Sequence, residues 1–354
     1  MKLSFIVGPN GVGKSQHLIE LARASQKGHA IFVCNTVHDR SYVLKNAKRF
    51  SIRNSASRPA NVIKSVLKKV LKEGTHRLNQ IDRVLSYCGY QSYITITVKT
   101  GELDRRAEGH ADIPFIQHML GSMERSFEGK NRKEFHVSFN GDYDTNTVVF
   151  LESLFTKNKT YKQLGLIRAI DIDLYRKDGS RVPLARASSG ELSLITSMLF
   201  ILSEMEGSNL LLIDEPENSL HPKWQREYIR TLYSLLSYHE IEIVVATHSP
   251  LIVAGARMEM DVNASIYHPS NGLLDKSYSK NIESLLWEQF DTISPSSRFL
   301  SDTLSIELDR LSRKEITEET AQDFIDSAMS ASFDDTQNDL FLAAKKLAAS
   351  IARG

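Results

Sequence analysis

The hydrophobic pattern divides this 354-residue chain into continuous apolar runs, helical repeats and alternating segments. Apolar runs at residues 3–7, 209–213 and 241–246 predict strands buried on both faces, as in a parallel sheet covered by helices. Helical patterns follow the first run at 16–24 and precede the second run at 192–204. Strands and helices in this arrangement predict an α/β fold with a mixed core sheet.

Alternating segments predict a second, antiparallel sheet. Residues 92–100 and 134–139 alternate as half-buried strands, and residues 167–184 form a hairpin pattern that turns at Asp178-Gly179. The hairpin carries Asp171 and Asp173, a spacing that also occurs in metal-binding nucleases. Alternation along a strand beside a turn explains this pair more simply.

A basic insertion is expected at about residues 41–90. From Ser41 to Lys72 there are nine lysines and arginines and no acid. Apolar residues from Val62 to Leu71 recur at helical spacing, and the opposite face carries Lys64, Lys68, Lys69 and Lys72. These lysines form either a solvated helix face or a contact to DNA, RNA or an acidic partner.

The segment 256–354 is expected to be a helical cap or oligomerisation region following a first domain at 1–255. It contains amphipathic patterns at 297–311, 317–331 and 337–352. We recognise no nuclease domain in this segment.

Composition narrows the class of protein only slightly. Lysine plus arginine (44) balance aspartate plus glutamate (43), so overall charge favours neither nucleic acid nor an anionic membrane as a partner. Cys34 and Cys88 are too few and too far apart for a disulfide framework or a metal site, which favours a reducing compartment. Without a leader or a run of about 20 apolar residues, we expect a soluble cytoplasmic protein.

The first strand leads into a phosphate-binding loop. The segment from Gly8 to Ser15 reads GPNGVGKS and matches G-x-x-x-x-G-K-[ST], with a strand before it and a helix after it. In this motif backbone amides surround the phosphates, Lys14 reaches the β- and γ-phosphates, and the Ser15 hydroxyl binds Mg²⁺. The expected nucleotide contacts are Pro9, Asn10, Gly11, Val12, Gly13, Lys14, Ser15 and Gln16.

Two later strands end in residues suited to phosphate chemistry. The run at 209–213 delivers Asp214, expected to hold Mg²⁺, and Glu215, expected to polarise the attacking water. The run at 241–246 leads to His248, which is placed to donate a hydrogen bond to the terminal phosphate. The candidate catalytic residues are therefore Lys14, Glu215 and His248.

A fourth segment, ASSGELS at 187–193, places small residues and free amides at the start of a long helix. By itself this pattern predicts only a well-capped helix. It becomes a candidate functional segment because it lies shortly before the strand that ends in Asp214 and Glu215.

Together these segments resemble the heads of ABC-type ATPases, in the branch that includes DNA-repair and chromosome-maintenance ATPases and the overcoming-lysogenisation-defect nucleases. GPNGVGKS resembles Walker A, ASSGELS the signature motif, LLLIDEPENSLHP Walker B with its D-loop, and VVATHSP the switch histidine. The resemblance implies a P-loop NTPase fold and a site shared between two protomers. The residues of one protomer that would then meet the ATP of the other are Ser188, Ser189, Gly190, Glu191, Ser219 and His221.

The chain also departs from that family pattern. The strands that often carry an adenine-stacking residue before Walker A are absent from this sequence, and we assign no such residue. The family's glutamine after the second core strand has no evident equivalent, although Asn35, Thr36 or His38 occupies the corresponding place in chain order.

The resemblance implies an ATPase that dimerises or oligomerises around ATP and controls a separate nuclease or toxin. Stand-alone ATPases of anti-phage systems such as Septu and retrons are similar in this respect. Two alternatives stay open: a repair-type ATPase that binds DNA through the basic helix, and a non-hydrolysing ATP-bound scaffold that sequesters an effector.

Overall fold

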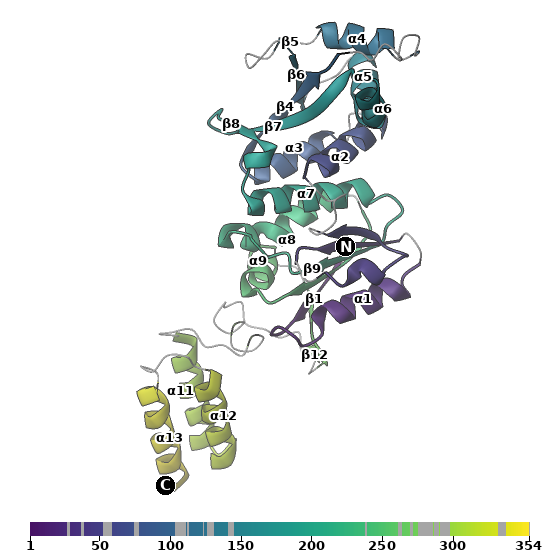
Figure 1. Ribbon diagram of the computed structural model, residues 1–354. Helices are drawn as coiled ribbons and strands as arrows, with labels where there is room; N and C mark the ends of the chain where they lie inside the picture. The colour runs from purple at the N-terminus through teal and green to yellow at the C-terminus, as the bar shows by residue number, and fades with distance from the viewer. Residues whose placement is uncertain are drawn as a thin grey trace.

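The computed structural model describes most of the chain (Figure 1). The described residues are 1–26, 29–36, 39–51, 59–73, 78–102, 111, 113–122, 124–125, 131–140, 145–237, 239–260, 264–269, 272–274, 286, 290, 298–331 and 338–353. His38, one of the three residues in the place of the family's glutamine, lies outside these ranges.

A seven-stranded sheet forms the core, in the order β12-β11-β1-β10-β9-β2-β3. Every pairing is parallel except that of β11 with β12, so the sheet is mixed, as the sequence predicts. The strands are β1 (Lys2–Val7), β2 (Ala30–Cys34), β3 (Lys48–Ser51), β9 (Leu210–Asp214), β10 (Glu242–Thr247), β11 (Ser265–His268) and β12 (Gly272–Leu274). Since β11 and β12 belong to this sheet, the sheet extends beyond residue 255, where the sequence analysis ends the ATPase domain.

Helices cover both faces of the core sheet (Figure 1). Alternate strand residues such as Ile6 and Phe32 pack against α1 (Lys14–Ala24). The intervening residues, such as Phe5 and Ile31, belong to the larger hydrophobic core on the other face. That core includes α7 (Ser189–Glu204), α8 (Pro222–Leu236) and α9 (Pro250–Met260). Burial of both strand faces explains why these strands read as continuous apolar runs.

The second sheet is antiparallel, as the sequence predicts, in the order β5-β6-β4-β7-β8. Helices α2 and α3 lie between it and α7 (Figure 1). Its strands are β4 (Tyr90–Thr100), β5 (Glu124–Arg125), β6 (Arg132–Ser138), β7 (Ile167–Arg176) and β8 (Arg181–Pro183). Its helices are α2 (Pro59–Glu73), α3 (Leu78–Tyr87), α4 (Ile113–Ser122), α5 (Thr145–Thr156) and α6 (Asn158–Gln163). Short 3₁₀ segments occur at Ser41–Val43 and Leu184–Arg186.

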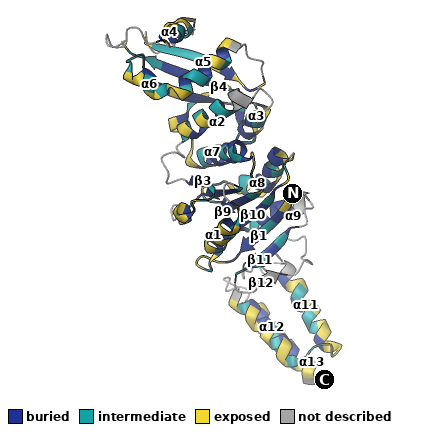
Figure 2. Ribbon diagram, turned by 90° about the vertical axis from the view of Figure 1, so that its right-hand side faces the viewer, coloured by how far each residue is buried: buried dark blue, intermediate teal, exposed yellow. Residues whose placement is uncertain are grey.

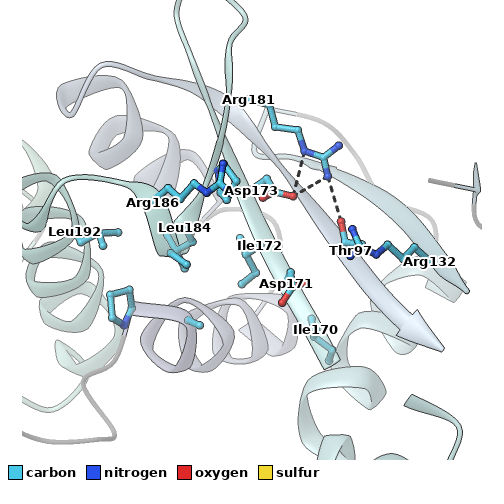
Figure 3. Close-up of a pocket in the computed structure, with 14 residues that line it drawn as sticks. Thr97, Arg132, Ile170, Asp171, Ile172, Asp173, Arg181, Leu184, Arg186 and Leu192 are labelled. Atoms are coloured by element: carbon cyan, nitrogen blue, oxygen red, sulfur yellow. Dashed lines mark hydrogen bonds and ion pairs between the residues drawn. The ribbon is translucent and has the colours of Figure 1, made fainter. Parts of the chain in front are cut away.

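The aspartates of the hairpin form ion pairs with basic side chains. Asp173 is buried and accepts hydrogen bonds from Arg181 Nε (3.2 Å) and Nη2 (2.7 Å), beside a cavity of about 710 Å³ (Figure 3). Asp171 pairs with Lys99 Nζ at 2.6 Å. Within the described ranges, no three His, Cys, Asp or Glu side chains gather as a metal-binding group. Both aspartates are thus paired with cations of the same sheet, Lys99 on β4 and Arg181 on β8.

Arg181→Ala is expected to lower the free energy of unfolding by about 1–3 kcal/mol, because it leaves the buried Asp173 carboxylate without its cation. Chemical denaturation measures this. Arg186→Ala is the matched control, since Arg186 lines the same cavity and forms no ion pair with a described residue (Figure 3). Removing Asp173 together with Arg181 should recover part of the lost free energy of unfolding. If Arg181→Ala lowered the free energy of unfolding no more than Arg186→Ala, the stabilising role of the Arg181–Asp173 pair would be contradicted.

The C-terminal helices form a bundle with its own hydrophobic core. They are α11 (Arg298–Ser312), α12 (Glu318–Ala331) and α13 (Asn338–Arg353), close to the expected ranges. Figure 2 shows buried residues along their inner faces and exposed residues outside. No helix in the described part of the chain is long and apolar enough to cross a bilayer.

Candidate functional site

The loop between β1 and α1 depends on glycine at sharp backbone turns. Gly11 and Gly13 have φ angles of 91° and 98°, in the left-handed region that L-residues with side chains disfavour. Gly13 precedes the first helical residue, Lys14. The loop thus has the left-handed glycines and the helix start that let backbone amides bind an anion in this motif.

Lys14 folds back over the loop. Its Nζ donates to the carbonyls of Gly8 (2.8 Å) and Pro9 (3.1 Å), and its side chain is buried. Burial lowers the Lys14 pKa, while the nearby charges of Glu215, Glu217 and Asp214 oppose that shift. An anionic phosphate is a stronger partner than these neutral carbonyls, so a phosphate bound in the loop would take the ammonium from them.

Ser15 and Asp214 are in direct contact although they are 199 positions apart in sequence. Ser15 Oγ donates to Asp214 Oδ1 at 3.0 Å, because β1 and β9 are both neighbours of β10 and end at the same edge of the sheet. Burial raises the pKa of Asp214 to about 7, helped by the charge of Glu215 and opposed by the Ser15 hydrogen bond and Lys14. A hydroxyl and a carboxylate oxygen are the donor types that Mg²⁺ prefers, so this pair fits the ion.

Glu215 follows Asp214 in an unusual backbone conformation. Its φ is 48°, and its amide donates to the carbonyl of Ala246 at 2.9 Å. The carboxylate accepts a hydrogen bond from Asn218 Nδ2 (3.1 Å) and lies 3.6 Å from His248 Nδ1. The structure thus brings the candidate catalytic acid and the candidate switch histidine together at the sheet edge.

Glu217 is a site residue that the sequence analysis missed. It is 5% exposed, and its Oε1 accepts hydrogen bonds from Thr247 Oγ1 and the His248 amide, both at 2.7 Å. The same oxygen lies 3.1 Å from His248 Nδ1. An acid two residues beyond the Asp-Glu pair carries no distinctive pattern, and only the fold shows that it is buried beside β10.

The start of α7 is fixed by a reciprocal capping box. Ser188 Oγ accepts from the Glu191 amide (3.2 Å), and Glu191 Oε2 accepts from the Ser188 amide (3.1 Å). Glu191 also accepts from Tyr90 Oη (2.8 Å) and pairs with Arg176 (3.0 Å). Burial alone would raise the Glu191 pKa, but the hydrogen bonds from Tyr90 and Ser188 lower it. Glu191 is thus a helix cap held by the second sheet.

The candidate signature and D-loop residues share a groove of about 740 Å³. Gly190 lies so close to the D-loop that an added Cβ would stand 2.2 Å from the Ser219 carbonyl oxygen. Ser219 itself has a φ of 65°, and His221 caps α8 by accepting from the Lys223 amide at 3.2 Å. The groove is lined by Ser188, Ser189, Gly190, Ser219, Leu220, His221, Lys223 and Trp224, and none of these belongs to the phosphate-binding loop.

The candidate residues therefore form two groups. One contains the loop, Asp214, Glu215 and His248; the other contains the segment from Ser188 to Glu191 with Ser219 and His221. Among the loop residues, Pro9, Asn10 and Gln16 are exposed and Val12 is half-buried.

Two of the four lysines on the basic helix form hydrogen bonds with other parts of the chain. Lys64 Nζ donates to the Ile170 carbonyl at 3.2 Å, and Lys69 Nζ donates to the Ser203 carbonyl and to Glu204 Oε1 (3.2 Å). Lys68 is half-buried, and the side chain of Lys72 lies outside the described residues. This helix is therefore not a uniformly solvated lysine face.

Further side chains surround the loop. His268, at the end of β11, lies against Gly8, and Tyr267 stacks on His17 with ring centroids 4.8 Å apart. Asn35 is buried after β2, where its amide donates to the Asp214 carbonyl at 3.2 Å. The neighbouring Thr36 is half-buried. The register of β11 beside β1 could not be predicted, because no motif marks β11.

Comparison with known proteins agrees with this geometry. A model of the AAA ATPase domain family matches residues 53–253, which is more than half of the chain. The matched range contains the groove, Asp214, Glu215 and His248, and begins after the phosphate-binding loop. The chain thus belongs to the AAA ATPase domain family.

Two relatives match shorter stretches. The chain is 30% identical over 123 residues to "Retron Vc95 probable ATPase" of Vibrio cholerae serotype O1 biovar El Tor, covering 31% of this chain and 24% of the relative. It is 32% identical over 106 residues to "Protein ea59" of Escherichia phage lambda, covering 29% of this chain and 20% of the relative. The chain thus spans a quarter or less of the length of these relatives.

Proposed function

We propose that this protein is a magnesium-dependent ABC-type ATPase in which two copies of the chain close around ATP. One observation carries the proposal: the signature residues and the D-loop form a groove that contains no residue of the phosphate-binding loop. If the triphosphate bound in the loop of a second copy lay in this groove, both groups of residues would contact the same nucleotide. The amides at the start of α7 would then contact the terminal phosphate.

Within the proposed site each side chain has a distinct task. Lys14 would exchange its two carbonyl partners for phosphate oxygens, and Ser15 and Asp214 would hold Mg²⁺, which neutralises phosphate charge when bound. Glu215 would orient and polarise the attacking water. Asn218, which donates to Glu215, would fix the direction of that carboxylate.

We further propose that the ATP cycle controls a separate effector, a nuclease or toxin, in anti-phage defence. The named relative "Retron Vc95 probable ATPase" supports this association. The C-terminal bundle, with a core of its own, is a suitable region for oligomerisation or for binding such an effector. Copurification of the chain with the products of neighbouring genes tests the effector.

The shared site is tested by measuring the mass of the protein in solution together with phosphate release. ATP with Mg²⁺ should increase the mass of the wild type, and Lys14→Ala should show neither the increase nor hydrolysis. A wild-type mass that stays the same at saturating ATP would contradict the proposal. Turnover equal to that of Lys14→Ala would favour the non-hydrolysing scaffold instead.

A DNA-repair ATPase is the remaining alternative, and the engagement of Lys64 and Lys69 within the molecule argues against it. It would gain support from salt-sensitive DNA binding that is lost when Lys64, Lys68, Lys69 and Lys72 are neutralised.

A further inference from the structure

We infer that the cavity of about 710 Å³ beside Asp173 is a docking groove for an extended segment of a partner protein, which adds a strand to the open edge of β7 and pairs an acidic side chain with Arg186 (Figure 3). The inference goes beyond the proposed function and does not depend on it. It starts from a cavity and a strand edge that the proposed ATP site does not use.

Part of the outer edge of β7 has no strand beside it. β8 pairs with β7 only at residues 173–175, and after Pro183 the chain turns into the 3₁₀ segment Leu184–Arg186. β7 begins at residue 167. Among the residues that the structure describes, no strand pairs with residues 167–172 on the side away from β4. This stretch is the open edge of β7.

The main chain of Ile172 faces this open edge. In an antiparallel sheet the N–H and C=O of one residue point to the same neighbouring strand, and successive residues alternate. The Arg176 amide donates to the Ser180 carbonyl at 3.0 Å on the side of β8, and the Ile170 carbonyl accepts from Lys64 Nζ of α2 at 3.2 Å. Even-numbered positions of β7 therefore point away from β4. Ile172 thus offers one donor and one acceptor to a strand lying in line with β8.

The walls of the cavity suit an apolar side chain of such a strand. A cavity of this size, lined by apolar groups with a few polar ones, is typical of a binding site. Leu184 directly follows β8, and Leu192 lies in the first turns of α7, so a bound strand would lie against the helix that begins with the candidate signature residues. The apolar lining consists of Pro59, Ala60, Ile170, Ile172, Leu184 and Leu192.

The charges around the cavity favour an acidic segment. Asp173 pairs with Arg181, and Asp171 pairs with Lys99, so both lining carboxylates already have a cation. Arg186 is exposed, lines the cavity, and forms neither a hydrogen bond nor an ion pair with a described residue. A guanidinium binds a carboxylate through two parallel hydrogen bonds. Arg186 is therefore available to an Asp or Glu of the added strand, as main-chain pairing and side-chain pockets together give affinity and specificity in strand addition.

Hydrogen exchange of single amides in the nucleotide-free protein tests the open edge. The Ile172 amide should exchange at least about tenfold faster than the Leu174 amide, because Leu174 pairs with Val182 of β8. An Ile172 amide as protected as that of Leu174 would overturn the inference, and this measurement needs no variant.

Selection of displayed random peptides on the purified full chain tests the partner chemistry. Enriched peptides should alternate apolar residues and contain Asp or Glu, and a synthetic copy should slow exchange of the Ile172 amide. Arg186→Glu should weaken binding of that peptide at least about tenfold, because like charges then face each other. Ala185→Trp, a large side chain at an exposed lining position, should fill the groove and weaken binding to a similar extent.

The matched control is Arg230→Glu, the same charge reversal at an exposed residue of α8 that does not line the cavity. It should change the affinity less than about threefold. Failure to enrich any peptide, or enriched peptides that bind Ala185→Trp as tightly as the wild type, would refute the docking groove. If octanoate, an apolar tail with one carboxylate, protects the Ile172 amide and no peptide does, the cavity is a small-molecule site and strand addition is wrong. None of these measurements uses ATP, so their failure is distinct from a failure of the proposed function.

Discussion

Glu215→Gln is expected to slow ATP turnover by at least about a hundredfold while leaving ATP affinity within about threefold of the wild type. The amide keeps the size of the side chain and can still accept the hydrogen bond from Asn218. It lacks the negative charge that polarises the attacking water. ATP-loaded pairs of the chain should therefore persist, measured as a mass increase that no longer decays as ATP is consumed.

The matched control is Glu227→Gln, which removes a half-buried acid from α8. It should leave turnover near the wild-type value. Unchanged turnover in Glu215→Gln would refute the role assigned to this residue, whatever the state of assembly.

Gly190→Ala is expected to abolish the ATP-dependent mass increase and to lower hydrolysis more than about tenfold, while ATP still binds to the loop. The added methyl group would stand 2.2 Å from the Ser219 carbonyl oxygen, so the signature segment and the D-loop would have to separate. Overpacking of this kind costs about 1–3 kcal/mol of stability. Gly121→Ala is the control, because nothing lies within 4 Å of its added Cβ.

A mixing experiment separates a shared site from a site within one chain. Lys14→Ala lacks a working loop and Gly190→Ala lacks a working groove, so each should have little or no activity alone. A mixed pair holds one complete site of two, so mixing equal amounts should restore activity up to about half of the wild-type value. Activity no higher than that of the separate variants would contradict a shared site.

The strands and helices of the core were predictable because their sequence signal is strong. Burial on both faces made β1, β9 and β10 continuous apolar runs, and the alternation in β4 and β7 marked the second sheet. The loop and His248 each follow such a strand and Asp214 ends one, so their convergence at one sheet edge was expected from parallel pairing. The hairpin turn at Asp178-Gly179 was also predicted correctly, between β7 and β8.

Long-range contacts between unremarkable residues could not be predicted. Tyr90 and Glu191 are 101 positions apart, and nothing in either local pattern indicates that they share a hydrogen bond. Glu217 is a similar case, because the bonds that it accepts from Thr247 and the His248 amide depend on its burial beside β10. Lys64 and Lys69 show the converse: helical spacing placed them on one face, but only the fold showed that they contact backbone carbonyls.

The anchoring of Glu191 limits how the first turn of α7 can move. Its carboxylate is bound to Tyr90, the first residue of β4, and to Arg176, the last residue of β7. A rotation of that turn must therefore either break these bonds or carry the antiparallel sheet with it. A displacement of the groove at Ser188 would therefore be transmitted to β4 and β7 through two side-chain contacts.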